Sequence, residues 1–419
     1  MTVGSNTLAP ATAPGSTPPV GKGLVERMLA PIADVHPGEA TAALLMTLLM
    51  FLVLAAYYEL KTAREVFILS QGGAEVKSYS SAGQALLLLA LVPAYGAFAS
   101  RVNRERLVTW VTLFFVLNVV LFALAYTAGL AIGIPYFLWV GIFNVMVIAQ
   151  FWALANDVFT PEQGKRLFPL VGVGSSLGAW VGSVRAGHLV STEGPTRLLL
   201  GAGAILVICA LLARIISRRG RTATAGVVKT KADDAPLGKE GGFELIAKDR
   251  YLMLIALLMV LLNVVNSSGE YLLGRYVVEQ AQALYGAGPE GDAARQAFIG
   301  ATYSRLFSTV NLVGFLLQMF VVSRVFKYLG VGKSLFVHPL VAFAGYGLIL
   351  TGPSLGLMTA VKVADNSLDY SLGNTTKQAL TVPTFAAVTL VLAGAWLGVV
   401  GLLNVALRRK AEQAHISAL

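Results

Sequence analysis

One property of this sequence constrains its fold more than any other: long apolar runs recur along the chain, separated by short polar segments. A helix that crosses a membrane needs roughly 20 mostly apolar residues, and about eleven segments meet this need. Only 13% of the 419 residues are charged, whereas a soluble domain carries about 25%. The sequence therefore predicts an all-α polytopic membrane protein with about 11 transmembrane helices, and not a set of soluble domains.

The predicted helices divide into two groups around the longest polar segment, residues 217–250. This position predicts two helical halves joined by a linker. The predicted helices are 40–58, 79–99, 108–131, 134–156, 167–190, 197–216, 251–279, 298–323, 331–351, 354–373 and 384–407. The predicted organisation is a flexible cytoplasmic tail (1–38), an N-terminal six-helix bundle (39–216), a cytoplasmic linker (217–250), a C-terminal helical bundle that is one helix short (251–407) and a second tail (408–419).

The distribution of Lys and Arg predicts how these helices cross the membrane. Cytoplasmic loops collect basic residues, and the basic residues of this chain gather in alternate segments such as 101–106, 165–166 and 214–250. This pattern predicts a cytoplasmic N-terminus, and it explains the net charge of +10 without a nucleic-acid partner. An odd number of spans leaves "LRRK" (407–410) on the outer side. We therefore expect either one further span or a helix missing from the second half.

Two short motifs break this charge rule at matching places. "ELKTAR" (59–64) follows the first predicted helix of the first half, and "EYLLGR" (270–275) lies in the first predicted helix of the second half. Both read Glu-x4-Arg. Transporters are often built from two repeated halves, with the substrate site between them near the middle of the membrane. The match is short and chance remains the alternative, but a true repeat would place both motifs near such a site.

The charges of residues 59–65 allow two interpretations. The first helix ends at residue 58 and the charges reach the outer water layer, or the charges line a pathway inside the membrane. Lys61 and Arg64 are basic residues on the predicted outer side, where few basic residues are expected. Ionisable residues within a membrane usually have a function, so this exception favours the pathway. The shared helical face of Tyr57, Lys61 and Arg64 also favours it. Lys61 and Glu65 stand four residues apart and are expected to pair.

Polar residues in other predicted helices point to the same pathway. One helix ends in "QFWALAND" (150–157), and another runs into "KVADNSLDYSLGNTTKQAL" (362–380). There Lys362, Asp365 and Asp369 have the spacing of a ladder along one helical face. Each residue alone is more often an interhelical hydrogen bond than a ligand contact, but together they predict a water-filled cavity. Its cations favour an anionic substrate. The predicted gating or pathway residues are Glu59, Glu65, Asn156, Asp157, Asp365, Asn366 and Asp369.

Two glycine-containing motifs do not indicate nucleotide-binding loops. "LGVGKS" (329–334) lacks the first glycine of a phosphate-binding loop and the strand that must precede it. In "GVGSSLGAWVG" (172–182), Gly174, Gly178 and Gly182 have the small-xxx-small spacing of close helix packing in membranes. The four scattered histidines and the one cysteine predict no metal site. We expect no cofactor and no enzymatic activity.

Three stretches resemble one known family. "YYELKTAREVF" (57–67), "FWALANDVFTPEQGKRLFPLVGVGSSLGAW" (151–180) and "ADNSLDYSLGNTTKQAL" (364–380) resemble the nucleotide transporter family, the ATP/ADP translocases of plastids and obligate intracellular bacteria. The resemblance covers roughly residues 40–380. It implies a major-facilitator-like fold of two six-helix bundles and exchange of ATP for ADP without hydrolysis. It also implies a multi-pass protein of the bacterial inner (cytoplasmic) membrane.

The resemblance also implies site residues. The family depends on a Lys after its first helix, a Glu in its fourth, a Glu in its seventh and a Lys after its tenth. The matching positions are Lys61, Gln150, Glu270 and Lys377, so Gln150 departs from the family by losing a charge. The predicted substrate-binding residues are Lys61, Arg64, Gln150, Glu270, Arg275 and Lys377.

A second departure concerns the C-terminal part, where "TVPT" (381–384) leads directly to the last apolar run. The family has a further helix before that run.

The function that the resemblance implies is ATP/ADP-type antiport by alternating access. The alternatives are a secondary transporter of another organic anion, and a membrane partner protein without transport activity. The expected partners are ATP, ADP or another nucleotide and the lipid bilayer, and the sequence predicts no oligomeric state.

Overall fold

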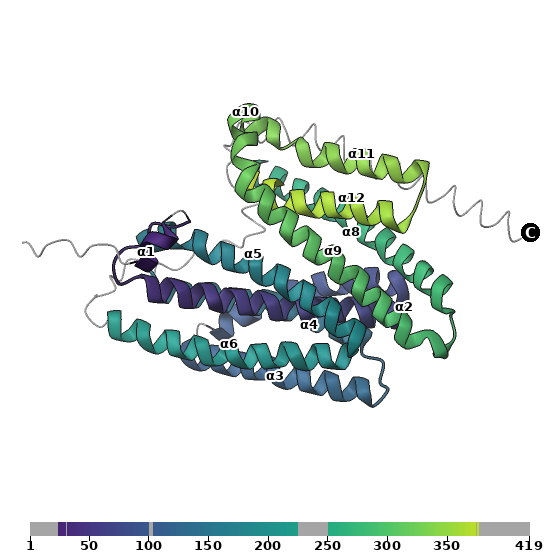
Figure 1. Ribbon diagram of the computed structural model, residues 1–419, viewed down its shortest axis with the longest axis horizontal. Coiled ribbons are helices and arrows are strands. Elements are labelled where there is room, and N and C mark those ends of the chain that lie inside the picture. The colour runs from purple at the N-terminus through teal and green to yellow at the C-terminus, as the bar shows by residue number, and fades with distance from the viewer. Residues whose placement is uncertain (1–23, 31, 100–103, 225–249, 374, 377–419) are drawn as a thin grey trace, which may run out of the picture.

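The structure, a computed structural model, describes residues 24–30, 32–99, 104–224, 250–373 and 375–376 (Figure 1). Within these ranges every regular element is a helix. In chain order they are α1 (Leu24–Leu29), α2 (Ala40–Ala99), α3 (Arg104–Thr127), α4 (Gly133–Val158), α5 (Pro161–Thr192), α6 (Pro195–Thr224), α8 (Arg250–Tyr285), η2 (Pro289–Gly291), α9 (Asp292–Phe320), α10 (Val322–Ser334), α11 (Val337–Thr351), α12 (Leu355–Leu368) and the π-helical turn η3 (Asp369–Gly373).

Several of these helices are suited to a membrane. By length and composition, five helices of the described residues can cross one, and a sixth span results if α9 and α10 are counted together despite their bend of 73°. Each predicted helix from 40–58 to 354–373 falls on a helix of the structure. The last predicted helix, 384–407, lies outside the described residues.

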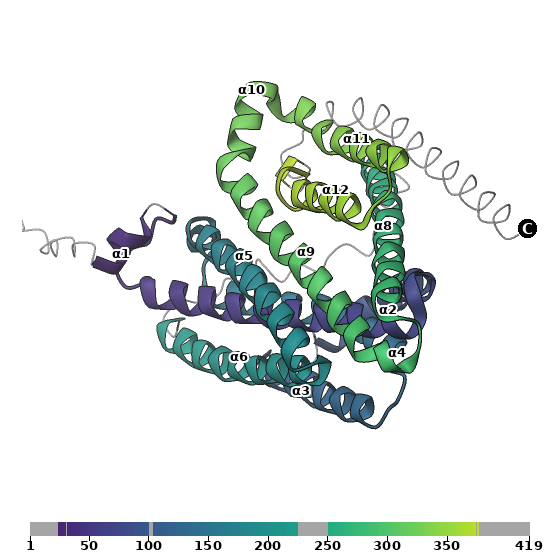
Figure 2. The ribbon, with the colours of Figure 1, turned by 45° about the vertical axis from the view of Figure 1, so that its right-hand side comes forward.

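The helices form two groups, with α2–α6 in one and α8–α12 in the other (Figures 1 and 2). In the first group α2 consists of two helices that meet at Gly73, where the backbone turns with a φ of 71°. This φ favours glycine, because side chains with a Cβ rarely adopt it. The Gln71 side chain beside the kink accepts a 2.6 Å hydrogen bond from the Gly133 amide at the start of α4. Because of the kink, α2 supplies two neighbouring helices of the first group. We call the part before Gly73 its first arm and the part after Gly73 its second arm.

The glycine spacing in α5 brings this helix into close contact with the first arm of α2. A Cβ added at Gly174 would lie 2.7 Å from the Thr47 carbonyl oxygen, and one at Gly178 would lie 2.1 Å from the Phe51 carbonyl oxygen. Gly182 meets Ala55 in the same way. These contacts confirm the predicted small-xxx-small packing, since any larger side chain would push the two backbones apart.

The two groups of helices touch through α2 and α5 on one side and α8 and α9 on the other. The Ser304 hydroxyl of α9 donates a 2.6 Å hydrogen bond to the Ser183 carbonyl oxygen of α5. Close by, Tyr58 of α2 donates to Asn311 of α9 at 2.9 Å. Figure 2 shows that α8 and α9 reach the end of the first group that lies away from α1. The contacts between the halves therefore gather toward that end.

Three predicted boundaries are wrong. The first predicted helix does not end at residue 58 but continues to the kink at Gly73, so the charges of 59–65 lie within a helix and not in a water-facing loop. Residues 24–38 are not a flexible tail, because α1 and the buried Ala33 and Val35 pack in this segment. Helix α6 also extends to Thr224, which is past the predicted start of the linker.

Candidate functional site

A cavity of about 610 Å³ lies between the two groups of helices, and we call it the central cavity. Both arms of α2 contribute to its wall, as do α4, α8, α9, α12 and η3. Its lining includes cations, one carboxylate, four aromatic rings and several amides and hydroxyls. The lining residues are Lys61, Arg64, Lys77, Ser78, Ser81, Ala82, Gln84, Ala85, Phe137, Asn263, Asn266, Ser267, Glu270, Tyr271, Phe307, Asn366 and Tyr370.

The continuous first arm of α2 explains why two cations reach the cavity together. Lys61 and Arg64 stand three residues apart on one helical face, and both line the cavity. After the kink at Gly73 the second arm brings Lys77 back beside the first. Its Nζ lies 2.8 Å from Glu65 Oε2. Three cations from one chain segment therefore surround the same space.

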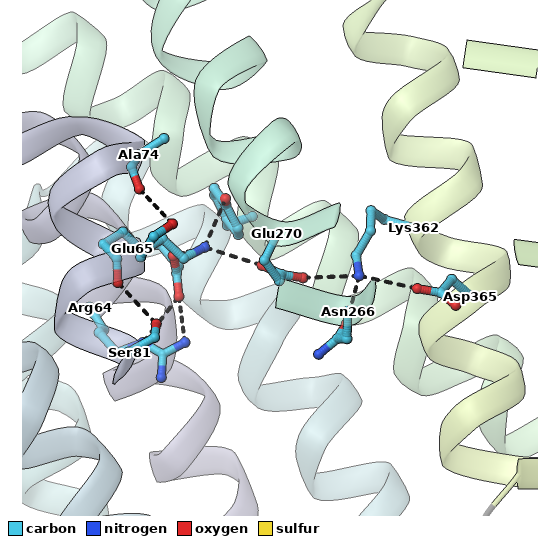
Figure 3. A network of polar contacts seen from close by, with 11 residues as sticks. Arg64, Glu65, Ala74, Ser81, Asn266, Glu270, Lys362 and Asp365 are labelled. Atoms are coloured by element: carbon cyan, nitrogen blue, oxygen red, sulfur yellow. Dashed lines mark hydrogen bonds and ion pairs between the residues drawn. The ribbon is translucent and has the colours of Figure 1, made fainter. Parts of the chain in front are cut away.

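A series of side chains with alternating positive and negative charge runs from the first half of the molecule into the second. Arg64 Nη2 lies 2.5 Å from Glu65 Oε1, and Lys77 Nζ lies 3.1 Å from Glu270 Oε2 in the other half. Glu270 Oε1 is in turn 3.4 Å from Lys362 Nζ, which is 3.3 Å from Asp365 Oδ2. We call this series the charge chain: Arg64, Glu65, Lys77, Glu270, Lys362 and Asp365. Figure 3 labels all of these residues except Lys77. Burial of these charges is tolerable because each has a partner of opposite sign.

Lys61 differs from the other cations of the cavity. Within the described residues, no carboxylate oxygen lies within 4.0 Å of its Nζ. Its ammonium instead lies over aromatic rings, 4.2 Å from the centre of Phe307 and 5.1 Å from that of Tyr58. The predicted pair between Lys61 and Glu65 is therefore wrong, because Arg64 and Lys77 occupy the Glu65 carboxylate. Lys61 therefore presents to the cavity a positive charge that no carboxylate of the described residues contacts directly.

The structure brings some of the predicted substrate-binding residues together and separates others. Lys61, Arg64 and Glu270 line the cavity. Gln150 does not: its amide donates a 3.1 Å hydrogen bond to the Tyr95 hydroxyl within the first half. Arg275 lies outside the cavity lining, half-exposed and 2.8 Å from Glu279 on its own helix. Lys377 lies outside the described residues.

The predicted pathway residues also divide. Asn366 lines the cavity, while Glu65 and Asp365 are buried members of the charge chain. Glu59 is fully buried and pairs with Arg185 of α5, away from the cavity lining. Asn156, Asp157 and Asp369 are also absent from the lining, and Asn156 is exposed at the end of α4. Asp369 begins the π-helical turn η3, and the Lys362–Asp365 step of the predicted ladder forms an ion pair.

Sequence reasoning missed three residues of this region. Lys77 belongs to none of the predicted site residues, and Lys362 was predicted only as part of a ladder with Asp365 and Asp369, but both are almost fully buried. His338 was dismissed as isolated, but its Nε2 lies 2.8 Å from Asp365 Oδ1. The spacing of Lys362 and Asp365 was the one local signal. Nothing local connects Lys77 with Glu270, which is 193 residues away in the sequence.

Comparison with solved structures identifies the fold. The structure is similar to that of a bacterial homologue of the iron transporter ferroportin in an inward-facing state, with a TM-score of 0.56 and 14% identity over 88% of this chain and 97% of that one. It is also similar to a bacterial metal transporter, with a TM-score of 0.52 and 13% identity over 88% and 98% of the two chains. No family model and no curated protein matches the sequence. The chain is therefore an all-α, multi-pass membrane protein with the two-bundle, major-facilitator-like fold of membrane transporters.

Proposed function

We propose that the protein is a secondary transporter that exchanges nucleotides, ATP for ADP, across the bacterial inner membrane by alternating access. One observation carries this proposal: Lys61 faces the cavity between the two halves without a carboxylate partner among the described residues. Arg64 lies three residues away on the same wall. The resemblance of three sequence stretches to the nucleotide transporter family supports the nucleotide as substrate.

The cations of the cavity suit a polyphosphate. Lys and Arg form charge-assisted hydrogen bonds with phosphate oxygens, and these bonds are roughly twice as strong as neutral ones. Glu65 and Glu270 neutralise Lys77 and the neighbouring cations in the absence of substrate. A phosphate that approaches Arg64 competes with Glu65 for the same guanidinium. Binding and release at Arg64 can therefore proceed by exchange of partners, so that the guanidinium keeps a partner of opposite charge.

The remaining lining suits a nucleoside. Phe137, Tyr271, Phe307 and Tyr370 present aromatic rings to the cavity, and stacking of a base on such a ring contributes about 1–3 kcal/mol in proteins that bind nucleic acids. Asn263, Asn266 and Asn366 add amides that can hydrogen-bond a base edge or a ribose. The volume of about 610 Å³ falls within the range of small-molecule sites.

Contacts between the halves suggest how access alternates. They gather toward the end of the molecule away from α1, where Tyr126 of α3 donates a 2.6 Å hydrogen bond to Gln296 of α9. With the predicted cytoplasmic N-terminus, that end faces outward. The structure then corresponds to a state closed on the outer side. A rocking motion of the two halves would open the Ser304–Ser183 contact and the Lys77–Glu270 pair across the interface.

The test is uptake of radiolabelled ATP into proteoliposomes that contain the purified protein and are preloaded with ADP. We expect uptake that needs internal ADP and is blocked by excess external unlabelled ADP but not by succinate. Lys61→Ala should lower uptake by at least tenfold, about 1.4 kcal/mol or more. The matched control, Arg305→Ala, removes an exposed cation of α9 outside the cavity and should leave uptake unchanged.

Three outcomes would contradict this proposal. Inhibition by succinate as strong as by ADP would indicate a carrier of general organic anions. Equal uptake by the Lys61→Ala variant and the wild type would exclude the cavity as the phosphate site. A protein that stays folded in detergent, shows no uptake and has the same melting temperature with and without nucleotide would indicate a function other than nucleotide transport.

A further inference from the structure

Next to the central cavity, the second half of the molecule contains a group of buried ionisable side chains that do not line it. His338 of α11 and Lys362 and Asp365 of α12 form this group, which we call the buried triad. Their exposed fractions are 7%, 0% and 4%. His338 Nε2 lies 2.8 Å from Asp365 Oδ1, and the other oxygen of the same carboxylate lies 3.3 Å from Lys362 Nζ. A histidine is thus joined to a lysine through one carboxylate, within the protein interior.

Lys362 connects this triad to the cavity. Its Nζ lies 3.4 Å from Glu270 Oε1 and donates a 2.8 Å hydrogen bond to Asn266 Oδ1, and both of these residues line the cavity. Figure 3 shows Lys362 between Glu270 and Asp365. The ammonium is therefore shared between a carboxylate at the substrate site and a carboxylate at the histidine. A change of charge at His338 alters how strongly Asp365 holds Lys362.

Charged groups face His338 from the surrounding elements. On α12 these are Asp365 and Lys362, and through Lys362 the charge chain reaches Glu270 of α8. On η3, Asp369 Oδ1 and His338 Nδ1 both approach Gly373, at 3.2 Å and 3.8 Å from the position of a Cβ on that glycine. Lys333 lies in the last turn of α10, shortly before α11 begins, but its side chain is exposed. One carboxylate thus contacts Nε2, and a second lies on the side of the ring where Nδ1 and Gly373 meet.

The charge chain is balanced when His338 is neutral. It then contains three cations (Arg64, Lys77, Lys362) and three carboxylates (Glu65, Glu270, Asp365). The neutral ring already donates Nε2–H to Asp365, because an ionised carboxylate can only accept. A proton that adds to the imidazole therefore goes to Nδ1, and it makes the charge chain together with His338 positive by one charge. Lys362 is held less by Asp365 and becomes available to Glu270 and to an anion in the cavity. An anion in the cavity and a proton on His338 therefore stabilise each other.

We propose that His338, held by Asp365, is the binding site of a proton that is transported together with the anionic substrate. This inference rests on the proposed function, because it needs an anion in the central cavity. The proton adds to the ring nitrogen that lacks one and leaves the same nitrogen after the halves have moved, so no other reactant takes part. Thermodynamic linkage requires the effect to be reciprocal: protonation tightens anion binding, and anion binding takes up a proton.

The test measures the protons taken up when ADP binds to the purified full-length protein, by calorimetry at pH 6.5 in buffers of different ionisation enthalpy. The wild type should take up more protons per ADP than His338→Gln, with a difference of up to one. The nucleotide's own titration cancels, because both proteins bind the same ligand. The control variant His188→Gln removes an exposed histidine of α5 and should behave like the wild type.

The same samples should show the linkage in affinity. For the wild type, the dissociation constant of ADP should rise by about tenfold more between pH 6 and pH 8 than for His338→Gln, a typical size for coupling between two sites. Asp365→Asn retains the histidine but removes its partner, so it should reduce the difference as well. This second variant keeps the inference testable if His338→Gln does not give a monodisperse protein in detergent.

The outcomes separate the inference from the proposed function. Equal proton uptake and equal pH dependence in the wild type and in both triad variants, with ADP still bound, would overturn the inference and leave nucleotide transport intact. An absence of ADP binding to the folded wild type would overturn the proposed function itself. Proton uptake that depends on His338 but not on Asp365 would also contradict the proposal, because the proposed site needs both groups.

Discussion

The motifs "ELKTAR" in α2 and "EYLLGR" in α8 share the pattern Glu-x4-Arg but use it in opposite ways. In α2 the arginine, Arg64, lines the central cavity, while Glu59 is buried against Arg185 within the first half. In α8 the glutamate, Glu270, lines the cavity, while Arg275 is half-exposed beside Glu279. One half thus supplies a cation to the site and the other supplies a carboxylate.

Helix geometry explains why each motif supplies one charge and not two. An α-helix turns by about 100° per residue, so residues five positions apart point about 140° away from each other. Both members of a Glu-x4-Arg motif on a regular helix therefore cannot face the same cavity. The two motifs complement each other across the interface, with Lys77 between Glu65 and Glu270. A pattern repeated in two halves can therefore build an asymmetric site.

Replacing the two glutamates separately should show the largest difference between the two motifs. Glu59→Gln removes a fully buried charge that pairs within the first half, and loss of a buried partner costs about 3–5 kcal/mol, less here because Arg185 is partly exposed. Its melting temperature in detergent should fall while its affinity for ADP stays that of the wild type. Glu270→Gln should change both quantities. Unchanged ADP affinity in the Glu270→Gln variant would contradict its place in the site.

Replacing the two arginines tests the same contrast from the other side. Arg64→Ala removes a charged hydrogen-bond donor from the cavity, a loss of about 1.5–3 kcal/mol, or tenfold or more in ADP affinity. Arg275→Ala removes an exposed ion pair worth about 0–1 kcal/mol and should leave the affinity within about twofold. Dissociation constants from calorimetry would measure both. A similar loss in the two variants would show that the motifs are functionally equivalent after all.

The packing of the helix that carries "ELKTAR" can be tested through its glycine contacts. Gly178→Ala places a Cβ 2.1 Å from the Phe51 carbonyl oxygen, and overpacking of this kind costs about 1–3 kcal/mol. The melting temperature should fall. The control Gly172→Ala lies on the same helix where no atom is within 4 Å of the added Cβ, and it should keep the melting temperature of the wild type. Equal melting temperatures in the two variants would exclude the close approach of α5 and α2.

The smallest effect on stability is expected for the ion pair between Glu39 and Arg166 at the start of α2. Arg166 donates hydrogen bonds to Glu39 at 2.9 Å and 3.0 Å, and these bonds lower the pKa of the Glu39 carboxyl from 4.5 to about 2. A lowered pKa in the folded protein means that the stabilisation is present above about pH 4.5 and is lost as the pH falls toward 2. The pair is partly exposed, so we expect about 1 kcal/mol.

The measurement for this pair is the melting temperature in detergent at pH 7 and pH 3. Between these values the wild type should lose more stability than Glu39→Gln, which no longer has a titrating group at this position. The control Glu162→Gln changes an exposed carboxylate in the first turn of α5 and should follow the wild type. An identical pH dependence in wild type and Glu39→Gln would show that the pair does not anchor α2.

Local patterns in the sequence pointed to a few residues of the site, but not to most of its lining or to its connections. The helical spacing of Lys61 and Arg64 and the charges of α8 pointed to Lys61, Arg64 and Glu270, and all three line the central cavity. The predicted helix end at residue 58 was wrong, because charge in a sequence marks a water boundary and a buried polar site in the same way. The charge chain shows that Arg64, Glu65 and Glu270 face partners of opposite charge.

The sequence by itself determined the helices and their closest packing. Apolar length and glycine spacing are local properties, and a membrane-spanning helix satisfies its backbone hydrogen bonds within itself. Only the tertiary structure decided which charges meet. Lys77 and Glu270 belong to different halves, and His338 reaches Asp365 from a separate helix. Such pairs form because a charge inside a low-dielectric interior needs a partner, and the fold decides which partner is within reach.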